Sequence, residues 1–343
     1  MVTVIITTYG ANTKLLRAIE SVLWQSYKDL EVVVVDDNNP DSAERKATES
    51  MMLRYREDSR VRYIKHNENK NGAAARNTGI SNANGEYIAF LDDDDYYLPK
   101  KIEKSVILLD SNHDLVGVCQ RVVRINNNHV VDVMHVEDGH ILTTEDVLIS
   151  KEGIGSGSNI FVCKEVVDRL GGFDTQFQRK QDIEFILRVV KSGPVVFQGE
   201  VQIVKDVSGI RRLNYENNRN ALIQFVDKFR SEIDELTQDK RKEYFTTQYT
   251  FLYNVARLTG NREIIKKAAE DLSMYDRSAV EKIKKASLTA LEYRIVGLTE
   301  IPLCQKLIEH MRNKRYVKMQ EQIIPEIGQD KYSEITEWMG IHE

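Results

Sequence analysis

The chain has few of the features that mark secreted or membrane-spanning proteins. It contains three cysteines among 343 residues, and Cys119, Cys163 and Cys304 show neither the spacing of metal ligands nor a pairing pattern. Scattered cysteines of this kind are typical of proteins in a reducing compartment. No apolar run approaches the ~18 residues that a membrane-spanning helix needs, and the first residues lack the basic region and long apolar stretch of a signal peptide. We therefore expect a cytoplasmic protein.

Basic residues are not in excess either. The chain has 48 Lys and Arg against 53 Asp and Glu, and the formal net charge of −5 offers no global attraction for nucleic acid. With 41% hydrophobic residues, the chain has the material for a large core. Its length predicts a second module beside the first domain.

Strands and helices alternate in the first part of the chain. Residues 2–7 form a short apolar run, apolar residues then recur at helical spacing over 15–23, and residues 31–35 are again apolar. This order predicts a parallel sheet with a right-handed crossover. The later expected elements are a helix after Pro40, a strand at 61–64, a helix at 72–80 and a strand at 86–91. We expect an α/β domain over 1–212, with a nucleotide-binding half at 1–98 and a more mixed half at 99–212.

Two common nucleotide-binding loops are missing. A dinucleotide-binding protein carries Gly-x-Gly-x-x-Gly after its first strand, and residues 7–12 (TTYGAN) do not fit that pattern. The Gly-Lys-Ser/Thr sequence of a phosphate-binding loop is missing as well. Instead, acidic residues follow two expected strands, as Asp36 and Asp37 and as the run 92–95.

Residues 92–95 are four consecutive aspartates directly after the apolar run 87–91. Adjacent carboxylates repel one another, so their placement at the end of a strand is unfavourable unless a cation binds there. Mg²⁺ and Mn²⁺ prefer oxygen ligands and commonly bring a substrate diphosphate with them. Open α/β sheets also bind ligands at the carboxyl ends of their strands. The alternative is a solvated acidic turn.

Five separated blocks of the sequence resemble the family 2 glycosyltransferases, which have the GT-A fold. In the family's order they are VIITTY (4–9), SVLWQSY (21–27), VDDN (35–38), NGAAARNTGI (71–80) and GEYIAFLDDDD (85–95). The resemblance covers about residues 1–210. It implies a Rossmann-like mixed sheet that binds a nucleotide-diphospho-sugar with the help of Mn²⁺ or Mg²⁺.

The resemblance also implies roles for individual residues at the donor site. It places Thr7, Tyr9, Asp37, Arg76, Asp92 and Asp93 in donor binding and makes Asp94 the metal ligand. Asp93 stands where the family often has Ser or Ala, so whether it adds a ligand or faces solvent stays open. The alternatives are a packed ring for Tyr9, a surface ion pair for Arg76 and a helix N-cap or turn for Asp37.

A catalytic base is implied further along the chain. GGFD (171–174) followed by QDIEFILR (181–188) resembles the acceptor-side signature of the family, in which the second residue of an acidic pair is the base. That residue is Asp182, while Gln181 replaces the usual Glu and is a further candidate for the acceptor pocket or lid. Asp182 would take a proton from the acceptor hydroxyl as it attacks with inversion. The alternative is that Asp182 only caps the helix and that Glu184 or Asp174 lies near the chemistry.

Two glycine-containing segments are candidates for an acceptor pocket or a lid. The stretch 153–159 includes Gly157 and Ser158, and Gly allows the backbone to approach a ligand closely. The alternative is a flexible connector. Arg211 and Arg212 follow the last expected strand, where they could close over the diphosphate or lie at the surface.

From about residue 213 to 343 the sequence becomes helical, and Gly and Pro almost disappear. The simplest interpretation is a helical module that packs on the catalytic domain or on a second copy of the chain. Basic residues in this part could instead rest on an anionic membrane, where a lipid-linked acceptor would be found; they are Lys282, Lys284, Lys285, Arg312, Lys314, Arg315 and Lys318.

The sequence therefore predicts an inverting, metal-dependent glycosyltransferase that uses a nucleotide sugar and a glycan or lipid-linked acceptor. The resemblance to the family implies that the donor is a UDP-sugar. Members of the family usually act in bacterial surface-polysaccharide or glycoconjugate assembly. A location at the inner face of the plasma membrane agrees with this role. Two alternatives stay open, namely a sugar-phosphate nucleotidyltransferase and a non-catalytic scaffold with a vestigial site.

Overall fold

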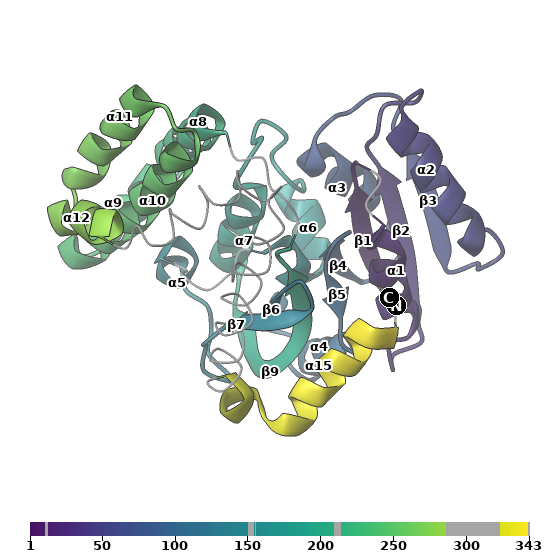
Figure 1. Cartoon of the computed structure of the whole chain (residues 1–343). Coiled ribbons are helices and arrows are strands. Elements are labelled where there is room, and N and C mark those ends of the chain that lie inside the picture. The colour runs from purple at the N-terminus through teal and green to yellow at the C-terminus, as the bar shows by residue number, and fades with distance from the viewer. Residues whose placement is uncertain (11–12, 150–153, 155, 209–213, 286–322, 342–343) are drawn as a thin grey trace. The chain divides into compact units, whose positions relative to one another are not determined.

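The computed structural model describes residues 1–10, 13–149, 154, 156–208, 214–285 and 323–341 (Figure 1). The described residues divide into two compact units. The first lies within 1–128, 132–209 and 327–343, and the second within 129–131 and 210–326. Arg211, Arg212, Arg312, Lys314, Arg315 and Lys318 lie outside the described residues.

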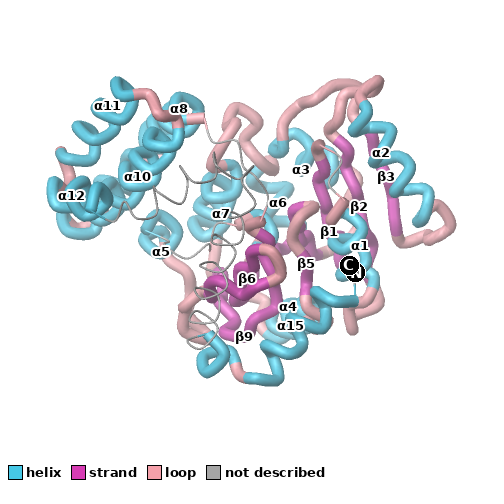
Figure 2. The backbone as a smooth tube through the Cα atoms, viewed as in Figure 1, coloured by secondary structure: helices cyan, strands magenta, loops and turns pink. Residues whose placement is uncertain are grey.

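The described strands form a nine-stranded sheet with the order β3-β2-β1-β4-β8-β6-β9-β5, and β7 pairs with β6 outside this order. Figure 2 shows the strands in magenta among the helices. The strands are β1 (Val2–Thr8), β2 (Leu30–Asp36), β3 (Val61–Lys65), β4 (Tyr87–Asp92), β5 (Tyr96–Tyr97), β6 (Gly117–Asn126), β7 (His129–Val133), β8 (Phe161–Cys163) and β9 (Val195–Asp206). Strands β3, β2, β1 and β4 run parallel, and β8 pairs antiparallel with both β4 and β6. The mixed sheet confirms the predicted fold class.

Helices connect these strands. They are α1 (Leu15–Leu23), α2 (Ala43–Met52), α3 (Gly72–Ser81), α4 (Lys101–Ser111), α5 (Thr144–Ile149), α6 (Lys164–Leu170) and α7 (Gln181–Ser192), with the short 3₁₀ helices η1 (Leu53–Tyr55) and η2 (Gly157–Asn159). Helix α15 (Gln329–Ile341) is grouped with the first unit. The helices expected at 15–23 and 72–80 and after Pro40 are all present.

The sheet has an apolar centre because β1 and β2 have neighbours on both sides. Every residue of β2 is buried, which fits the continuous apolar run expected of an interior parallel strand. Strand β1 pairs with β2 and β4 in register, so that Thr8 lies beside Asp36 and Thr7 beside Asp92. The carboxyl ends of β1, β2 and β4 therefore meet at one edge of the sheet.

The second unit is helical. It contains α8 (Tyr215–Lys228), α9 (Arg230–Glu235), α10 (Gln238–Leu258), α11 (Arg262–Ser273) and α12 (Arg277–Lys285). Its core consists of residues of α8, α10, α11 and α12, including Leu222, Leu252 and Leu272. Asn261 caps α11 with its side chain, at the junction between α10 and α11. Among the described helices, none has the length and hydropathy needed to cross a membrane.

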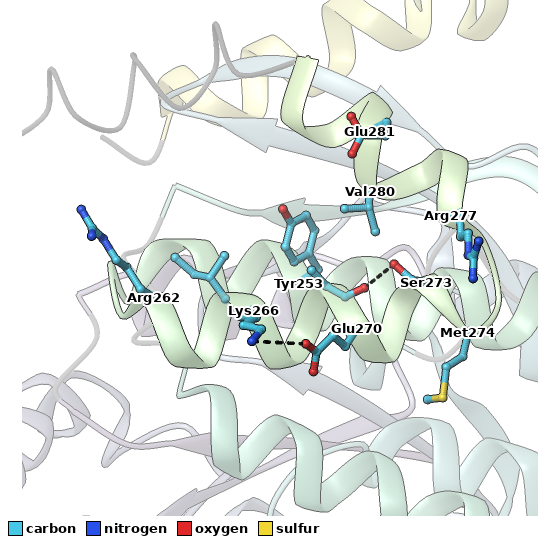
Figure 3. A pocket seen from close by; sticks show the side chains of 11 residues that line it. Tyr253, Arg262, Lys266, Glu270, Ser273, Met274, Arg277, Val280 and Glu281 are labelled. Atoms are coloured by element: carbon cyan, nitrogen blue, oxygen red, sulfur yellow. Dashed lines mark hydrogen bonds and ion pairs between the residues drawn. The ribbon is translucent and has the colours of Figure 1, made fainter.

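A hollow of about 800 Å³ opens between α10, α11 and α12 (Figure 3). Apolar side chains such as Ile265, Ala269 and Val280 line it together with charged ones, and Lys266 pairs with Glu270 at 3.9 Å. None of the residues that the sequence placed in the catalytic site contributes to this hollow.

Candidate active site

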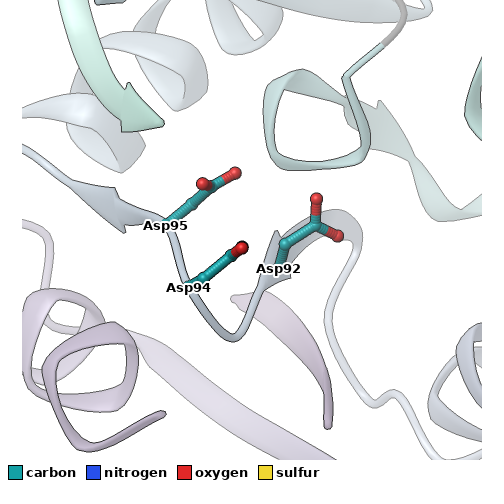
Figure 4. Close-up of side chains that lie close together, drawn as sticks. All are labelled: Asp92, Asp94 and Asp95. Atoms are coloured by element: carbon teal, nitrogen blue, oxygen red, sulfur yellow. The ribbon is translucent and has the colours of Figure 1, made fainter. Parts of the chain in front are cut away.

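The acidic run begins where β4 ends. Asp92 is the last residue of β4, and Asp95 directly precedes β5. One oxygen from each of Asp92, Asp94 and Asp95 lies within 4.8 Å of the others, and the three side chains rise from the same turn (Figure 4). The turn between two strands of the sheet therefore gathers three carboxylates in a small volume.

Asp95 is the most enclosed member of this group, with none of its surface exposed. Its Oδ2 accepts hydrogen bonds from Lys205 Nζ at 2.7 Å and from Ser158 Oγ at 2.6 Å, and its Oδ1 accepts one from the backbone N–H of Asp206 at 3.1 Å. Burial raises the pKa of Asp95, and the Lys205 ammonium opposes that rise. These hydrogen bonds hold the Asp95 side chain in the interior and thereby determine the conformation of the acidic turn.

Asp92 lies between two cationic side chains. Arg76 Nη2 donates to Asp92 Oδ1 at 2.9 Å, and Lys205 Nζ donates to Asp92 Oδ2 at 3.2 Å. The Asp92 backbone N–H also donates to Ser158 Oγ at 3.1 Å. Arg76 comes from α3, Lys205 from β9 and Ser158 from η2, so three separate elements determine the position of Asp92.

Asp94 differs from its two neighbours. Within the described part of the chain, no donor forms a hydrogen bond or ion pair with its carboxylate. Burial and the nearby carboxylates of Asp95 and Asp92 raise the pKa of Asp94 to about 7. A half-buried carboxylate beside other carboxylates is stabilised by a cation, and oxygen ligands suit Mg²⁺ or Mn²⁺. The residues present thus fit the metal that the fold family implies.

Asp93 is turned toward β1, where Thr8 Oγ1 donates to its Oδ2 at 2.6 Å. The sequence left open whether Asp93 adds a metal ligand or faces solvent. In the structure its side chain is half-buried and hydrogen-bonded to Thr8 at the end of β1. It therefore stands apart from the group of three carboxylates.

Asp182 is the second residue of α7 and faces the same space as Asp92. Arg76 Nη2 lies 3.3 Å from Asp182 Oδ1 and thereby joins Asp182 and Asp92 through one guanidinium group. Burial raises the pKa of Asp182, while Arg76 and a hydrogen bond from the backbone of Gly157 oppose that rise. A carboxylate with a raised pKa is a stronger base than a solvated one, and the permanent cation keeps it oriented.

The alternative roles considered for this region are not supported by its geometry. The residue at the N-cap position of α7 is Lys180, so Asp182 is not the cap of this helix. Glu184 is fully buried and bound by Arg188 Nε at 2.6 Å. Asp174 accepts a hydrogen bond from the backbone N–H of Gln176 at 3.0 Å in a local turn. Asp182 is the carboxylate of this segment that is linked to Asp92.

Gln181 and Gly157 complete the surroundings of Arg76. Gln181 Oε1 accepts from Arg76 Nη1 at 3.1 Å, so the amide replaces a carboxylate without losing the acceptor. A Cβ at Gly157 would lie 3.0 Å from Arg76 Nη2 and 3.1 Å from Asp182 Oδ1. Any larger residue at Gly157 would therefore press on the Arg76–Asp182 pair. Gly157 and Ser158 lie beside the carboxylates of this site, and their expected part in an acceptor pocket stays a prediction.

Arg76, Gly157 and the acidic turn lie in the part of the chain that matches a known family, whereas Asp182 and Lys205 lie beyond it. The family described as Glycosyl transferase family 2 matches residues 3–171. Escherichia coli WfgD, whose name is UDP-Glc:alpha-D-GlcNAc-diphosphoundecaprenol beta-1,3-glucosyltransferase, is 30% identical over 198 residues, which cover 57% of this chain and 72% of WfgD. The chain belongs to glycosyltransferase family 2.

Solved structures confirm the fold of this family 2 member. The crystal structure of S. aureus TarS 1-349 in complex with UDP-GlcNAc matches with a TM-score of 0.55 and 15% identity, covering 83% of this chain and 92% of that chain. An uncharacterized glycosyltransferase of Rickettsia felis is 24% identical over 340 residues, which are 98% of this chain and 54% of the relative. The chain thus spans about half the length of that curated relative.

In this family 2 chain, Asp37 follows β2 and is only 3% exposed. Its Oδ1 accepts from the Lys70 backbone N–H at 2.8 Å and lies 2.7 Å from His66 Nδ1. Its Oδ2 accepts from Asn69 Nδ2 at 2.8 Å and from the Asn71 backbone N–H at 3.0 Å. Both oxygens are occupied by the segment 66–71, so a direct bond to a nucleobase would require one of these contacts to be replaced.

Thr7 and Tyr9 lie at the end of β1, where the donor nucleoside was expected. Thr7 pairs with Asp92 on the neighbouring strand, which places it at the edge of the acidic turn. The Tyr9 ring is 64% exposed, so the alternative of a packed ring is wrong. An exposed aromatic face at the end of a parallel strand is available for stacking on a base.

Sequence reasoning missed Lys205 and a second ionic group behind the acidic turn. Asp206 is paired with Lys14 Nζ at 2.8 Å and with Arg17 Nη2 at 3.0 Å. Burial raises the pKa of Asp206, but the hydrogen bonds from Lys14, Ser208 and Arg17 outweigh it and lower the pKa to about 2. The only signal in the sequence was a Lys-Asp pair at the end of the apolar stretch 201–204.

Proposed function

We propose that this chain is an inverting, metal-dependent glycosyltransferase that moves a sugar from a nucleotide-sugar donor to an acceptor hydroxyl. The observation that carries the proposal is the position of Arg76, which contacts both Asp92 at 2.9 Å and Asp182 at 3.3 Å. One guanidinium thereby holds an acidic residue of the donor side next to the expected base. Such an arrangement serves a reaction in which a leaving diphosphate and an attacking hydroxyl meet at one carbon.

The oxygen of the acceptor hydroxyl attacks the anomeric carbon from the face opposite the diphosphate, and Asp182 accepts the proton of that hydroxyl. Arg76 orients Asp182 and favours its charged form before the attack. Gly157 leaves room for both side chains. The divalent ion, when bound, stabilises the negative charge of the departing diphosphate, and Asp94 is the residue that we assign to hold it.

We propose a UDP-linked donor and a glycan or lipid-linked acceptor. Crystal structures of TarS contain UDP or UDP-GlcNAc, and the name of WfgD specifies a UDP-sugar and a diphosphoundecaprenol-linked acceptor. Tyr9 and Thr7 are assigned to the nucleoside. This chemistry fits the assembly of bacterial surface polysaccharides or glycoconjugates at the cytoplasmic face of the membrane.

We assign the chemistry to a catalytic domain at 1–212 and a supporting role to the helical part at 213–343, of which α15 is grouped with the first unit. Core residues of α8, α10, α11 and α12 pack with one another, which supports a separate module. Contact with the membrane or with a second copy of the chain is the proposed role of this module. The exposed residues Lys282 of α12 and Leu258 of α10 are available for such contacts.

The test is a panel of nucleotide sugars, each incubated with the protein and Mn²⁺ or Mg²⁺ without an acceptor. We expect slow hydrolysis of one UDP-sugar, which chelation of the metal with EDTA abolishes and added Mn²⁺ restores. The matched control is the Asp94→Asn variant, which should lose metal-dependent hydrolysis while it keeps the fold. Absence of both binding and hydrolysis across all donors would contradict the proposal.

A further inference from the structure

Lys205 is a lysine inside the acidic site that none of the proposed catalytic steps uses. It lies near the end of β9, and its side chain is 15% exposed. Its ammonium reaches Asp95 Oδ2 at 2.7 Å and Asp92 Oδ2 at 3.2 Å. Burial alone would lower the pKa of Lys205, but the carboxylates of Asp95 and Asp92 outweigh that effect and raise it. Lys205 is therefore a fixed positive charge.

The contacts of Lys205 divide the three clustered carboxylates into two kinds. The ammonium binds both Asp92 and Asp95. Arg76 also donates to Asp92, and Ser158 and the Asp206 backbone N–H also donate to Asp95. Asp94 lies in the same 4.8 Å cluster, but no described donor holds its carboxylate. One carboxylate of the three is thus left for a metal ion.

We propose that Lys205 is a positioning residue that occupies Asp92 and Asp95, so that the nucleotide-free site holds a divalent cation only weakly and the cation binds together with the donor diphosphate. The part of this inference that concerns the diphosphate rests on the proposed function. The part that concerns the cation alone rests on the contacts of Lys205.

Two physical effects support this role. An ammonium only a few ångströms from a divalent cation repels it, and at this depth the repulsion is weakly screened by salt. Mg²⁺ and Mn²⁺ usually take one or two protein carboxylates and complete their coordination with substrate phosphates. A site that offers one unoccupied carboxylate therefore needs the diphosphate as a partner. By thermodynamic linkage, cation and diphosphate then increase each other's affinity by the same factor.

The test is a titration of this chain with Mn²⁺, in which electron paramagnetic resonance measures the concentration of unbound Mn²⁺. Without nucleotide, we expect the Lys205→Met variant to bind Mn²⁺ at least about tenfold more tightly than the wild type, because the variant loses a repulsive charge and the ammonium no longer occupies Asp92 Oδ2. Damage to the site would weaken Mn²⁺ binding, so this increase separates a positioning role from a merely structural one.

Two matched variants serve as controls. Lys205→Arg keeps the positive charge and should bind Mn²⁺ as weakly as the wild type. Lys104→Met removes another lysine that is paired with an acidic residue of β9, Glu200, outside the acidic turn. This variant should leave the Mn²⁺ affinity unchanged.

The buried Asp95 loses a partner in Lys205→Met, and this loss can prevent folding. The double variant Lys205→Met with Asp95→Asn removes the ammonium and that carboxylate together. It still removes the ammonium from Asp92 Oδ2 and should also bind Mn²⁺ more tightly than the wild type. If the folded variants, without nucleotide, bind Mn²⁺ no more tightly than the wild type, the role assigned to Lys205 is wrong.

A second titration contains UDP. In the wild type we expect UDP to tighten Mn²⁺ binding by a large factor, and in Lys205→Met this factor should be smaller. If UDP has no effect on Mn²⁺ binding in the wild type, the proposed donor is contradicted, whereas the comparison without nucleotide still decides the role of Lys205. The two failures are therefore distinguishable.

Discussion

Asp182 shows how a single residue depends on its immediate surroundings. Its carboxylate contacts the Arg76 guanidinium and lies against the backbone of Gly157. The guanidinium keeps the carboxylate charged and oriented, while burial makes it a stronger base than a solvated aspartate. These opposing effects suit the proposed role of Asp182, which is to accept a proton during turnover and then release it.

Replacing Asp182 with Asn tests this assignment. Asn keeps the size of the side chain but cannot accept the proton, so we expect transfer to fall by about 10²–10⁴-fold. Binding of the donor should stay unchanged, as measured by calorimetry with a non-hydrolysable donor. Asp168→Asn is the matched control, because Asp168 lies on the exposed side of α6 and forms a surface ion pair with Lys164. Transfer at the wild-type rate by Asp182→Asn would contradict the role.

Individual residues also show how far the sequence alone could lead. Arg76, Asp92 and Asp182 were expected to act together because they lie in blocks shared with the family, and the structure brings them into one contact network. Lys205 could not be expected in the same way. It pairs with Asp95 across 110 positions, and its place next to the acidic turn depends on the pairing of β9 with β5.

Among the elements, α3 illustrates close packing of a helix on the sheet. Gly79 of α3 faces Ile5 of β1, and a Cβ at Gly79 would lie 2.3 Å from Ile5 Cγ2. The helix can therefore approach the strand only where no side chain stands between them. This close approach places the Arg76 side chain of the same helix beside the end of β4.

We predict that Gly79→Ala destabilises the protein in spite of the higher helix propensity of Ala. Overpacking of this kind typically costs about 1–3 kcal/mol, which exceeds the ~1 kcal/mol gained in helix propensity at its upper range. Urea unfolding followed by circular dichroism measures the change. Ser81→Ala, at the exposed end of the same helix, should leave the unfolding free energy within about 0.5 kcal/mol of the wild type. An equal effect of both substitutions would show that the contact with Ile5 is unimportant.

The regular elements of the first unit could be predicted because their apolar residues follow helical or strand periodicity. The 3₁₀ helix η2 could not, since its sequence GSN at 157–159 carries no such pattern. Its conformation depends on distant partners. Ser158 bonds to Asp92 and Asp95, and Asn159 Oδ1 accepts from the Gln120 backbone N–H at 2.7 Å. Tertiary contacts decide such segments, and a single sequence does not display them.

At the scale of the whole molecule, stability includes the cost of one buried amine. Lys101 is 1% exposed, and its Nζ lies 4.6 Å from the Tyr97 ring centroid and 4.4 Å from that of Phe161. Within the described residues it has no hydrogen-bond partner. Burial lowers the pKa of Lys101 to about 7. The unfolded chain therefore binds more protons than the folded one between about pH 7 and pH 10.5, and stability rises with pH across that window.

We predict that Lys101→Met raises the unfolding free energy at pH 7 by roughly 1–4 kcal/mol, since an apolar side chain replaces an ionisable group in the core. The difference from the wild type should shrink as the pH approaches 10, where the unfolded lysine also begins to lose its proton. Urea unfolding at pH 7 and pH 10 measures both values. Lys100→Met changes an exposed neighbour and should show neither effect. A difference in unfolding free energy between Lys101→Met and the wild type that does not change with pH would contradict the lowered pKa of Lys101.

The face of α3 that carries Arg76 and Asn77 binds the segment before and at the start of α7. Asn77 exchanges two hydrogen bonds of 2.8 Å with the backbone of Phe173, and Arg76 reaches Gln181 and Asp182. We therefore expect the two proposed halves, 1–98 and 99–212, to tolerate exchange poorly. Recombination between relatives at residue 98 would separate α3 from the residues that it contacts in this chain. A functional hybrid would have to inherit α3 and residues 171–182 from the same parent.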